Sequence, residues 1–370
     1  MSNFPTHGGN VYEVASRLGC RPEDILDYSA SINPIGPPEG LREVFSKHFE
    51  RLQHYPDIHN RELIHDLAAF HGVPAEQVVV GNGSTELIYW LPRVLGIRSA
   101  VVVLPTFSEY QRAFEIQGAK LTKLFAKPEN GFQPTVEQLA AVLDANAPEA
   151  ILVTHPGSPA GTLLPSVVRE QLLRACHERG MYCIVDEAFV DFCEDESFKS
   201  FLDETPRLIL IRSMTKFYGI PGVRVGYLLT SPAVAQSMHR FLPPWSVSTL
   251  AQVAGNYCLR QNEYRQRTLH LVMQERTIME KSLRKLAGFH VFSGRANYLL
   301  MEMDAIFPTA RELQEDLLKR ERILVRDCAS FEGLGDRYVR LAVRLPRQNS
   351  RLLAALGRWS GERGCVGDCS

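Results

Sequence analysis

The sequence carries almost no excess charge of either sign. Its 41 lysines and arginines nearly balance its 42 aspartates and glutamates, which leaves a formal net charge of -1. Nucleic-acid binding draws much of its affinity from a basic surface that neutralises phosphates. The composition lacks that basic excess, so we expect no nucleic-acid partner.

Long hydrophobic runs are missing as well. No apolar stretch reaches the roughly 20 residues that a membrane-spanning helix requires. Residues 1–10 also lack the charged-then-apolar order of a signal peptide. We therefore expect no membrane partner and a cytoplasmic location.

The cysteines and histidines follow no recognisable framework. Five histidines, at positions 48, 54, 59, 65 and 71, match no metal-ligand spacing, so no metal site is expected. Cys365 and Cys369 lie in a polar tail, residues 362–370, and two thiolates cannot complete a four-ligand structural zinc site. The other six cysteines are scattered through the chain without the spacing of a disulfide framework, at positions 20, 176, 183, 193, 258 and 328. We expect reduced thiols throughout.

A glycine-containing turn follows the apolar residues 78–80 and leads into an apolar helical run. The turn lacks the full dinucleotide fingerprint and has no Gly-Lys-Ser/Thr ending, so neither a dinucleotide loop nor a Walker loop is present. Free backbone N–H groups and hydroxyls at Ser84 and Thr85, together with the helix dipole, instead predict an anion site. A single phosphate suits that site best.

The segment most informative for chemistry is residues 212–226, which follow the apolar run 208–211. It places Lys216 beside the hydroxyls of Ser213 and Thr215, and Arg224 follows eight residues later. A desolvated lysine near other cations has a lowered pKa and can form a Schiff base with an aldehyde. The hydroxyl and guanidinium groups could hold a phosphate beside it. An aldehyde that carries a phosphate is pyridoxal 5'-phosphate (PLP).

Alternating strand and helix patterns predict an α/β fold with a largely parallel sheet. Apolar strands are predicted at residues 100–104, 150–153, 182–185 and 208–211. Ligands of such sheets collect at the carboxyl ends of the strands. Phe107 and Asp186 follow two of these strands, and a carboxylate at a strand end needs a proton donor or a cation. A protonated pyridine nitrogen would satisfy Asp186.

The pattern changes near residue 231 and predicts a smaller α+β lobe. The expected domains are an N-terminal arm contributing to the small lobe (1–45), a large PLP-binding domain (46–235), a small C-terminal domain (236–361) and the cysteine-containing tail (362–370). Arginines at 326, 340 and 344 stand among apolar strand residues. Exposed alternation explains one or two of them, whereas binding of an acidic substrate explains all three.

Two further loops suggest binding roles. The turn from His7 to Asn10 contains two glycines, so its backbone amides could wrap around an anion. Tyr55 precedes a proline, which holds it out of a helix and lets its hydroxyl project into a site.

With Asn82-Gly83, Asp186, Lys216 and Arg224 in this order, the chain resembles the fold-type I PLP-dependent aminotransferases over nearly its whole length. Within that superfamily it is most similar to the L-threonine-O-3-phosphate decarboxylases of cobalamin biosynthesis. The motifs that carry this resemblance are residues 7–10, 27–34, 186–189, 215–218, 244–247, 294–300 and 339–344. Histidinol-phosphate aminotransferases share the cofactor motifs.

The resemblance implies a role for each matching residue. Lys216 would form the Schiff base, Asp186 would pair with the pyridinium nitrogen and Phe107 would stack on the ring. Arg340 would take the substrate carboxylate. The cofactor phosphate would be held by Gly83, Ser84, Thr85, Ser213, Thr215 and Arg224, joined by Tyr55 from the second subunit of a homodimer. The substrate phosphate would fall to His7, Gly8, Asn10, Asn33 and Arg326.

One position departs from the family pattern. Ser158 stands where the family usually has the asparagine of Asn-Pro-Thr-Gly, whose side chain bonds the pyridine 3'-oxygen. A serine is shorter and would reach that oxygen directly or through a water.

The expected reaction is decarboxylation of L-threonine O-3-phosphate to (R)-1-amino-2-propanol O-2-phosphate for the cobalamin nucleotide loop. Residue types alone do not separate decarboxylation from transamination, so a histidinol-phosphate or related aminotransferase stays open. A non-catalytic PLP-binding sensor is a further alternative, although the chain keeps Lys216 and shows no DNA-binding domain.

Overall fold

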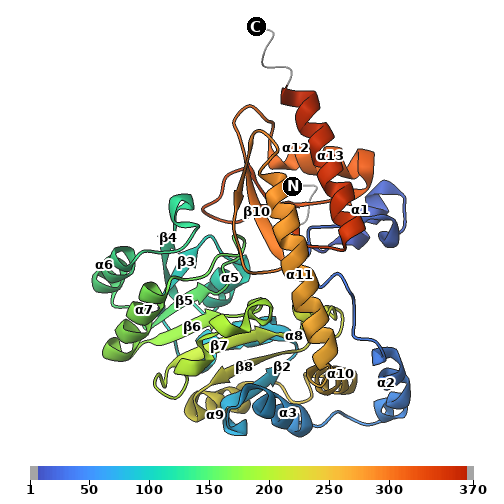
Figure 1. Cartoon of the computed structure of the whole chain (residues 1–370). Helices are drawn as coiled ribbons and strands as arrows, with labels where there is room; N and C mark the ends of the chain where they lie inside the picture. Colours follow the sequence, from blue (N-terminus) through green and yellow to red (C-terminus); the bar gives the residue numbers. More distant parts are fainter. Residues whose placement is uncertain (1–6, 365–370) are drawn as a thin grey trace.

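The computed structural model describes residues 7–364 and divides them between a large and a small lobe (Figure 1). A seven-stranded sheet forms the centre of the large lobe, in the order β2-β8-β7-β6-β5-β3-β4. Its strands are β2 (Val78–Gly81), β3 (Ser99–Leu104), β4 (Lys120–Phe125), β5 (Ala150–Thr154), β6 (Tyr182–Asp186), β7 (Leu208–Ser213) and β8 (Gly226–Thr230). β8 runs in the opposite direction to the other six strands, which are mutually parallel. The predicted α/β class and the four predicted strands of this sheet are confirmed.

Helices cover both faces of the sheet, which explains why its central strands are apolar throughout. A cluster of buried apolar residues lies on each face of the sheet. Each cluster contains strand residues together with residues from a different group of helices. One face packs against α4 (Gly83–Val94), α5 (Ser108–Ile116) and α9 (Pro232–Phe241). The other packs against α3 (Arg61–His71), α6 (Val136–Asn146), α7 (Ser166–Arg179) and α10 (Thr249–Leu259). This double burial fixes the strand ends, where the site residues lie.

The small lobe is built on a four-stranded antiparallel sheet. Its order is β12 (Arg326–Asp327), β13 (Tyr338–Ala342), β10 (Tyr298–Met303) and β9 (Phe289–Phe292). The helix α12 (Ala310–Glu321) begins at Thr309, whose hydroxyl accepts a hydrogen bond from the Glu312 amide in a capping box. The lobe also contains α13 (Pro346–Gly364) and α1 (Val11–Leu18).

Two short strands lie on either side of Val325 and belong to different sheets. β11 (Ile323–Leu324) pairs in parallel with β1 (Leu26–Asp27), whereas Arg326 begins β12 in the other sheet. β13 ends at Ala342, so Arg344 lies beyond the strand, contrary to the sequence-based prediction. The pairing of β1 with β11 joins the N-terminal arm to the small lobe.

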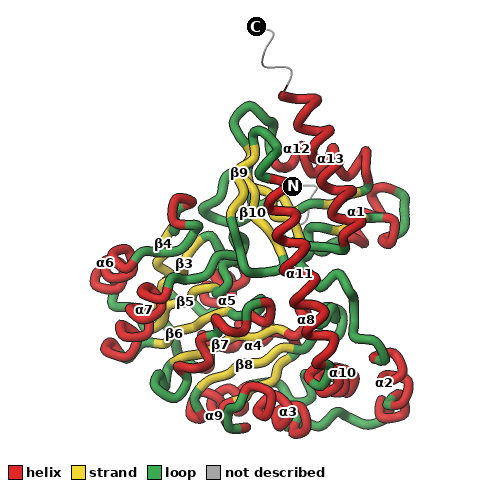
Figure 2. Tube along the Cα trace, in the orientation of Figure 1, coloured by secondary structure: helices red, strands yellow, loops and turns green. Residues whose placement is uncertain are grey.

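A long helix, α11 (Asn262–Leu283), runs from the large lobe into the small lobe (Figures 1 and 2). The expected boundary at 235/236 falls inside α9, which packs on α4, β2 and β8 of the large lobe. The next helix, α10, packs on α3 and on α2 (Leu41–Lys47). The chain therefore changes lobes along α11. In residues 7–364 we find no helix that could cross a membrane.

Candidate active site

A cleft opens at the carboxyl ends of the large-lobe strands, beneath the small-lobe sheet. Its volume, including the open solvent at its mouth, is about 980 Å³. Thirteen residues predicted from the sequence line it: His7, Gly8, Ser84, Thr85, Phe107, Ser158, Asp186, Ser213, Thr215, Lys216, Arg224, Arg326 and Arg340. The structure thus brings together residues that are up to 333 positions apart (340 − 7) in the sequence.

Lys216 is the amine of the cleft. It lies in the one-turn helix α8 (Met214–Phe217), directly after β7, and its side chain is partly buried. Burial, together with the positive charges of Arg340 and Arg224, lowers the pKa of Lys216 to about 8, and Asp186 opposes this shift. A substantial share of the amine is therefore neutral near physiological pH, as a nucleophile requires.

Asp186 ends β6 and is almost completely buried. Tyr110 donates a hydrogen bond to its Oδ2 atom, and the Ala188 amide donates to its Oδ1 atom at 2.7 Å. Burial raises the pKa of Asp186, whereas these hydrogen bonds and the charge of Lys216 lower it. The carboxylate is thus held rigidly in a place where a cation would stabilise its charged form.

Hydroxyl and guanidinium groups gather around the start of α4. The Oγ of Ser213 and the Oγ1 of Thr215 lie 2.8 Å apart, and Ser84 and Thr85 lie in the first turn of the helix. Arg224 has a positive φ of 63° and donates to the carbonyl oxygen of Pro221 at 3.1 Å. A helix N-terminus with these donors is an anion site.

The two predicted small-lobe arginines face each other across the sheet. Arg326 and Arg340 are direct partners in the antiparallel pair β12–β13, and both are buried. Arg340 donates from Nη2 to the carbonyl oxygen of Ser29 at 3.2 Å and from Nη1 to the Oγ of Ser158 at 3.4 Å. Arg344, by contrast, donates to the Asp27 carbonyl oxygen and lies outside the cleft. Two of the three arginines are therefore placed to bind an acidic ligand.

The sequence matches the family model of aminotransferase class I and II over residues 23–356. The chain belongs to this family. It is 38% identical to threonine-phosphate decarboxylase from Salmonella typhimurium, over 95% of both chains.

Solved structures share the fold. Histidinol-phosphate aminotransferase from Clostridium acetobutylicum is 27% identical, with a TM-score of 0.85 over 91% of this chain and all of that one. Histidinol-phosphate aminotransferase from Sinorhizobium meliloti, solved in complex with pyridoxal-5'-phosphate, gives a TM-score of 0.85 at 18% identity, over 96% of this chain and 95% of that one. The chain is thus an enzyme of the PLP-dependent aminotransferase superfamily, and PLP is its cofactor.

The packing of this aminotransferase-family member around Gly83 fits the cofactor phosphate. Gly83 has a positive φ of 75°, and a Cβ atom there would lie 2.6 Å from Nη2 of Arg224. Only glycine therefore lets the guanidinium approach the start of α4. Ser84, Thr85, Ser213, Thr215 and Arg224 would hold the phosphate, Asp186 would face the ring nitrogen, and Lys216 would supply the amine.

Phe107 follows β3 and lies beside the N-terminal arm. Its ring centroid is 5.5 Å from that of His7, whose Nε2 lies 3.0 Å from Oε1 of Glu109. His7 and Gly8 of the arm thus line the cleft together with the aromatic ring of Phe107.

Four predicted residues do not line the cleft. Gly83 contributes indirectly, because its lack of a side chain lets Arg224 approach. The side chain of Asn10 donates a hydrogen bond to Glu13. Tyr55 is 79% exposed, and its ring centroid lies 4.8 Å from that of Trp245. Asn33 requires a correction. Its buried amide donates to the Phe217 carbonyl oxygen at 2.7 Å and to the hydroxyls of Tyr264 and Thr268, both at 2.9 Å. Asn33 therefore ties the N-terminal loop to α8 and α11 instead of facing a substrate.

Three aromatic residues that line the cleft were not predicted as site residues, namely Tyr110, Phe189 and Phe331. Tyr110 bonds Asp186 although 76 positions separate them. Tyr110 follows the strand-end residue Phe107 by three positions and lies in the first turn of α5, so its nearness to a strand end was a usable signal. Phe331 also lines the cleft, but its loop carries no pattern that points to it.

Proposed function

We propose that the chain decarboxylates L-threonine O-3-phosphate to (R)-1-amino-2-propanol O-2-phosphate, the reaction required for the cobalamin nucleotide loop. The observation that carries this proposal is the pairing of Arg326 with Arg340 on the strands above Lys216. Two guanidinium groups suit a substrate with two anionic groups, because each can bind a carboxylate or a phosphate through two parallel hydrogen bonds. The 38% identity to a threonine-phosphate decarboxylase supports the same choice.

When bound, PLP supplies an electron sink for the bond that breaks at the substrate α-carbon. Asp186, at the end of β6, would hold a negative charge against a protonated ring nitrogen and so stabilise it. The Nζ of Lys216, whose pKa is lowered to about 8, is the group placed to return a proton to the α-carbon after carbon dioxide leaves.

Orientation of the substrate decides which bond breaks. Arg340 would hold the carboxylate, and Arg326, with the turn from His7 to Gly8, would hold the phosphate. Anchoring both ends restricts rotation about the α-carbon, so the carboxylate can be kept out of the ring plane. This restraint favours loss of carbon dioxide over loss of the α-proton.

A histidinol-phosphate or related aminotransferase is the second candidate. It is supported by the 27% identity and TM-score of 0.85 with histidinol-phosphate aminotransferase from Clostridium acetobutylicum. Histidinol phosphate has no carboxylate, so such an enzyme would use its arginines for the phosphate and for the carboxylate of the second substrate. Ser158 replaces the asparagine that is usual in the family, and this replacement favours neither candidate over the other.

One assay separates the candidates. The PLP-loaded protein is incubated with L-threonine phosphate, L-serine phosphate, or histidinol phosphate plus 2-oxoglutarate, and carbon dioxide and glutamate are measured separately. We expect carbon dioxide from threonine phosphate and no glutamate. Glutamate from histidinol phosphate, with no carbon dioxide from the phosphoamino acids, would replace the decarboxylase with the aminotransferase.

Arginine variants test the assigned substrate contacts. Arg326→Ala should raise KM for phosphorylated substrates most, whereas Arg340→Ala should abolish turnover of every amino acid. Arg344→Ala is the matched control, since Arg344 lies outside the cleft. Equal effects of all three variants on kcat/KM would contradict the assignment.

We also propose that the enzyme works as a cytoplasmic homodimer in which Tyr55 reaches the cofactor phosphate of the second subunit. The exposed Tyr55 and Trp245 rings, 4.8 Å apart, support a role for this surface in association. The free thiols of the six described cysteines agree with a reducing compartment.

A further inference from the structure

Phe331 lies between the two arginines of the small lobe. Its ring is 7% exposed and lines the cleft in the loop that follows β12. The Cζ of Arg326 lies 5.4 Å from the ring centroid, and the Cζ of Arg340 lies 5.8 Å from it. Both distances are within the reach of a cation–π interaction.

The arginine pair needs such a contact because of its register. Arg326 and Arg340 stand directly opposite each other in the antiparallel ladder, where like charges destabilise a sheet. Burial lowers the pKa of Arg326, and the charge of Arg340 lowers it further. The two guanidiniums therefore repel each other, and the negative potential of an aromatic face offsets part of that repulsion.

Neutral groups also contact these guanidiniums. Arg326 donates to the Oγ of Ser330 at 2.6 Å, and Arg340 donates to the Ser29 carbonyl and to the Ser158 hydroxyl. Arg340 also lies over the ring of Tyr298 at 5.1 Å. These hydrogen bonds and ring contacts hold the guanidiniums at the cleft.

The loop that carries Phe331 is anchored to the large lobe. Lys123, on the edge strand β4, places its Nζ 2.8 Å from both carboxylate oxygens of Glu332. A Cβ atom at Gly333 would lie 3.1 Å from Cδ1 of Phe125, so the loop backbone packs closely on that strand. The Phe331 amide also donates to the Cys328 carbonyl oxygen at 2.9 Å. The ring position is thus set by both lobes.

We propose that Phe331 is a positioning residue that sets the specificity of the site. Its ring holds Arg326 and Arg340 at the separation that fits an amino acid carrying both a carboxylate and a phosphate. The inference rests on the proposed function, because it assigns the two arginines to those two groups. Beyond that function, it assigns discrimination between substrates to an uncharged residue, Phe331.

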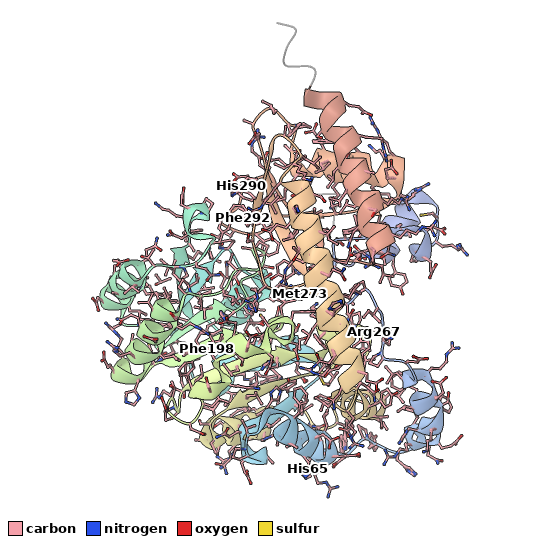
Figure 3. The ribbon with its side chains drawn as sticks, in the orientation of Figure 1. His65, Phe198, Arg267, Met273, His290 and Phe292 are labelled. Carbon is pink, nitrogen blue, oxygen red and sulfur yellow. The ribbon has the colours of Figure 1, made fainter. Side chains whose placement is uncertain are left out.

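Substitutions that change the ring face test this inference in the PLP-loaded enzyme. Phe331→Leu removes the aromatic face, and Phe331→Tyr retains it. Replacement of Phe331 by trifluorophenylalanine weakens the face at nearly constant volume, so it keeps the test open should the leucine variant fail to fold. Phe292→Leu is the matched control, because Phe292 belongs to the same apolar cluster as Phe331 and lies on β9 (Figure 3).

The readout is the dissociation constant of O-phospho-L-threonine and of L-threonine, measured from the cofactor absorbance in a stopped-flow instrument before turnover. Phe331→Leu should weaken binding of the phosphorylated ligand about tenfold and of L-threonine at most about threefold. Phe331→Tyr should restore the difference, the fluorinated variant should lose part of it, and Phe292→Leu should leave it unchanged.

An unchanged ratio of the two constants in both Phe331→Leu and the fluorinated variant would overturn the inference. Equal weakening in Phe292→Leu would do so as well, because it would point to general packing of the lobe. Carbon dioxide release is measured separately. A protein that releases none but still shows the predicted change in ratio would refute the decarboxylase and leave the role of Phe331 intact.

Discussion

The hydroxyl of Tyr110 donates a hydrogen bond to Oδ2 of Asp186, and both side chains are buried at the ends of neighbouring elements. This hydrogen bond lowers the pKa of a carboxyl that burial raises. The carboxylate must stay charged to stabilise a protonated ring nitrogen. Tyr110 therefore favours the charged form of Asp186, which the proposed role of this carboxylate requires.

Tyr110→Phe should shift the acid limb of the pH–activity profile to higher pH. Loss of a hydrogen bond to a charged group costs about 1.5–3 kcal/mol, so the pKa of Asp186, which this hydrogen bond lowers, should rise further. The kcat/KM profile between pH 5 and 9 measures the shift. Tyr89→Phe is the control, because Tyr89 also donates to a carboxylate, that of Glu109, outside the cleft lining. An acid limb that does not move would show that Asp186 is not the titrating group.

Capture of PLP by the apoenzyme should follow the titration of Lys216. Its pKa is lowered to about 8, so the neutral amine becomes abundant as the pH rises through 8. The rate of PLP binding should increase up to that pH and level off above it, well before the usual lysine range. Arg340→Gln removes a positive charge that lowers this pKa, so the midpoint should move upward. Lys216→Ala should give a protein that borohydride does not label with PLP.

Tyr55→Phe should weaken PLP binding by about 1.5–3 kcal/mol, the value of one hydrogen bond to a charged phosphate. The loss should appear only if Tyr55 reaches the cofactor of a second subunit. Equilibrium dialysis and sedimentation together measure both quantities. Tyr12→Phe is the control, because Tyr12 is similarly exposed but lies on α1. A strictly monomeric and fully active enzyme would refute the dimer.

Arg212→Met should destabilise the large lobe strongly. Arg212 is fully buried; its Nε lies 3.0 Å from Oε2 of Glu187, and its Nη1 lies 2.8 Å from Oε2 of Glu194. Removing one partner of a buried pair leaves unpaired charge and costs roughly 3–5 kcal/mol in the free energy of unfolding.

The loss in Arg212→Met should depend on pH. Burial raises the pKa of Glu187 to about 7, so this carboxyl is mostly protonated at pH 5 and ionised at pH 8. A missing cation should therefore cost more at pH 8. Urea unfolding at both pH values measures the difference, with Arg207→Met as an exposed control expected to lose less than about 1 kcal/mol. An equal loss at both pH values would show that Glu187 is not the group left unpaired.

Local features of the sequence were sufficient to predict four strands of the large sheet and to single out Lys216. An apolar run that ends in Asp186, and another that leads to Lys216, both predicted strand ends, where ligands of a parallel sheet collect. The same logic placed Phe107 and the start of α4. These predictions depend on a few adjacent residues, so they needed no knowledge of the packing.

Other relationships depended on contacts between distant segments. The chain passes from the large lobe to the small lobe along α11 and not at residue 235, because α9 and α10 pack on the large lobe. Asn33 has a polar side chain of the kind that often binds ligands, yet its side-chain amide donates hydrogen bonds to acceptors on α8 and α11. A polar residue in a loop does not reveal which partner it meets.

The sequence by itself determined the fold class, the family and the groups around Lys216, because these follow from strand-end chemistry and short motifs. Only the tertiary structure placed Arg326 opposite Arg340, bonded Tyr110 to Asp186 and set Phe331 against both arginines. The physical reason is register: which residues face each other across paired strands depends on how the whole lobe packs, and a shift of one residue would turn each arginine to the other face.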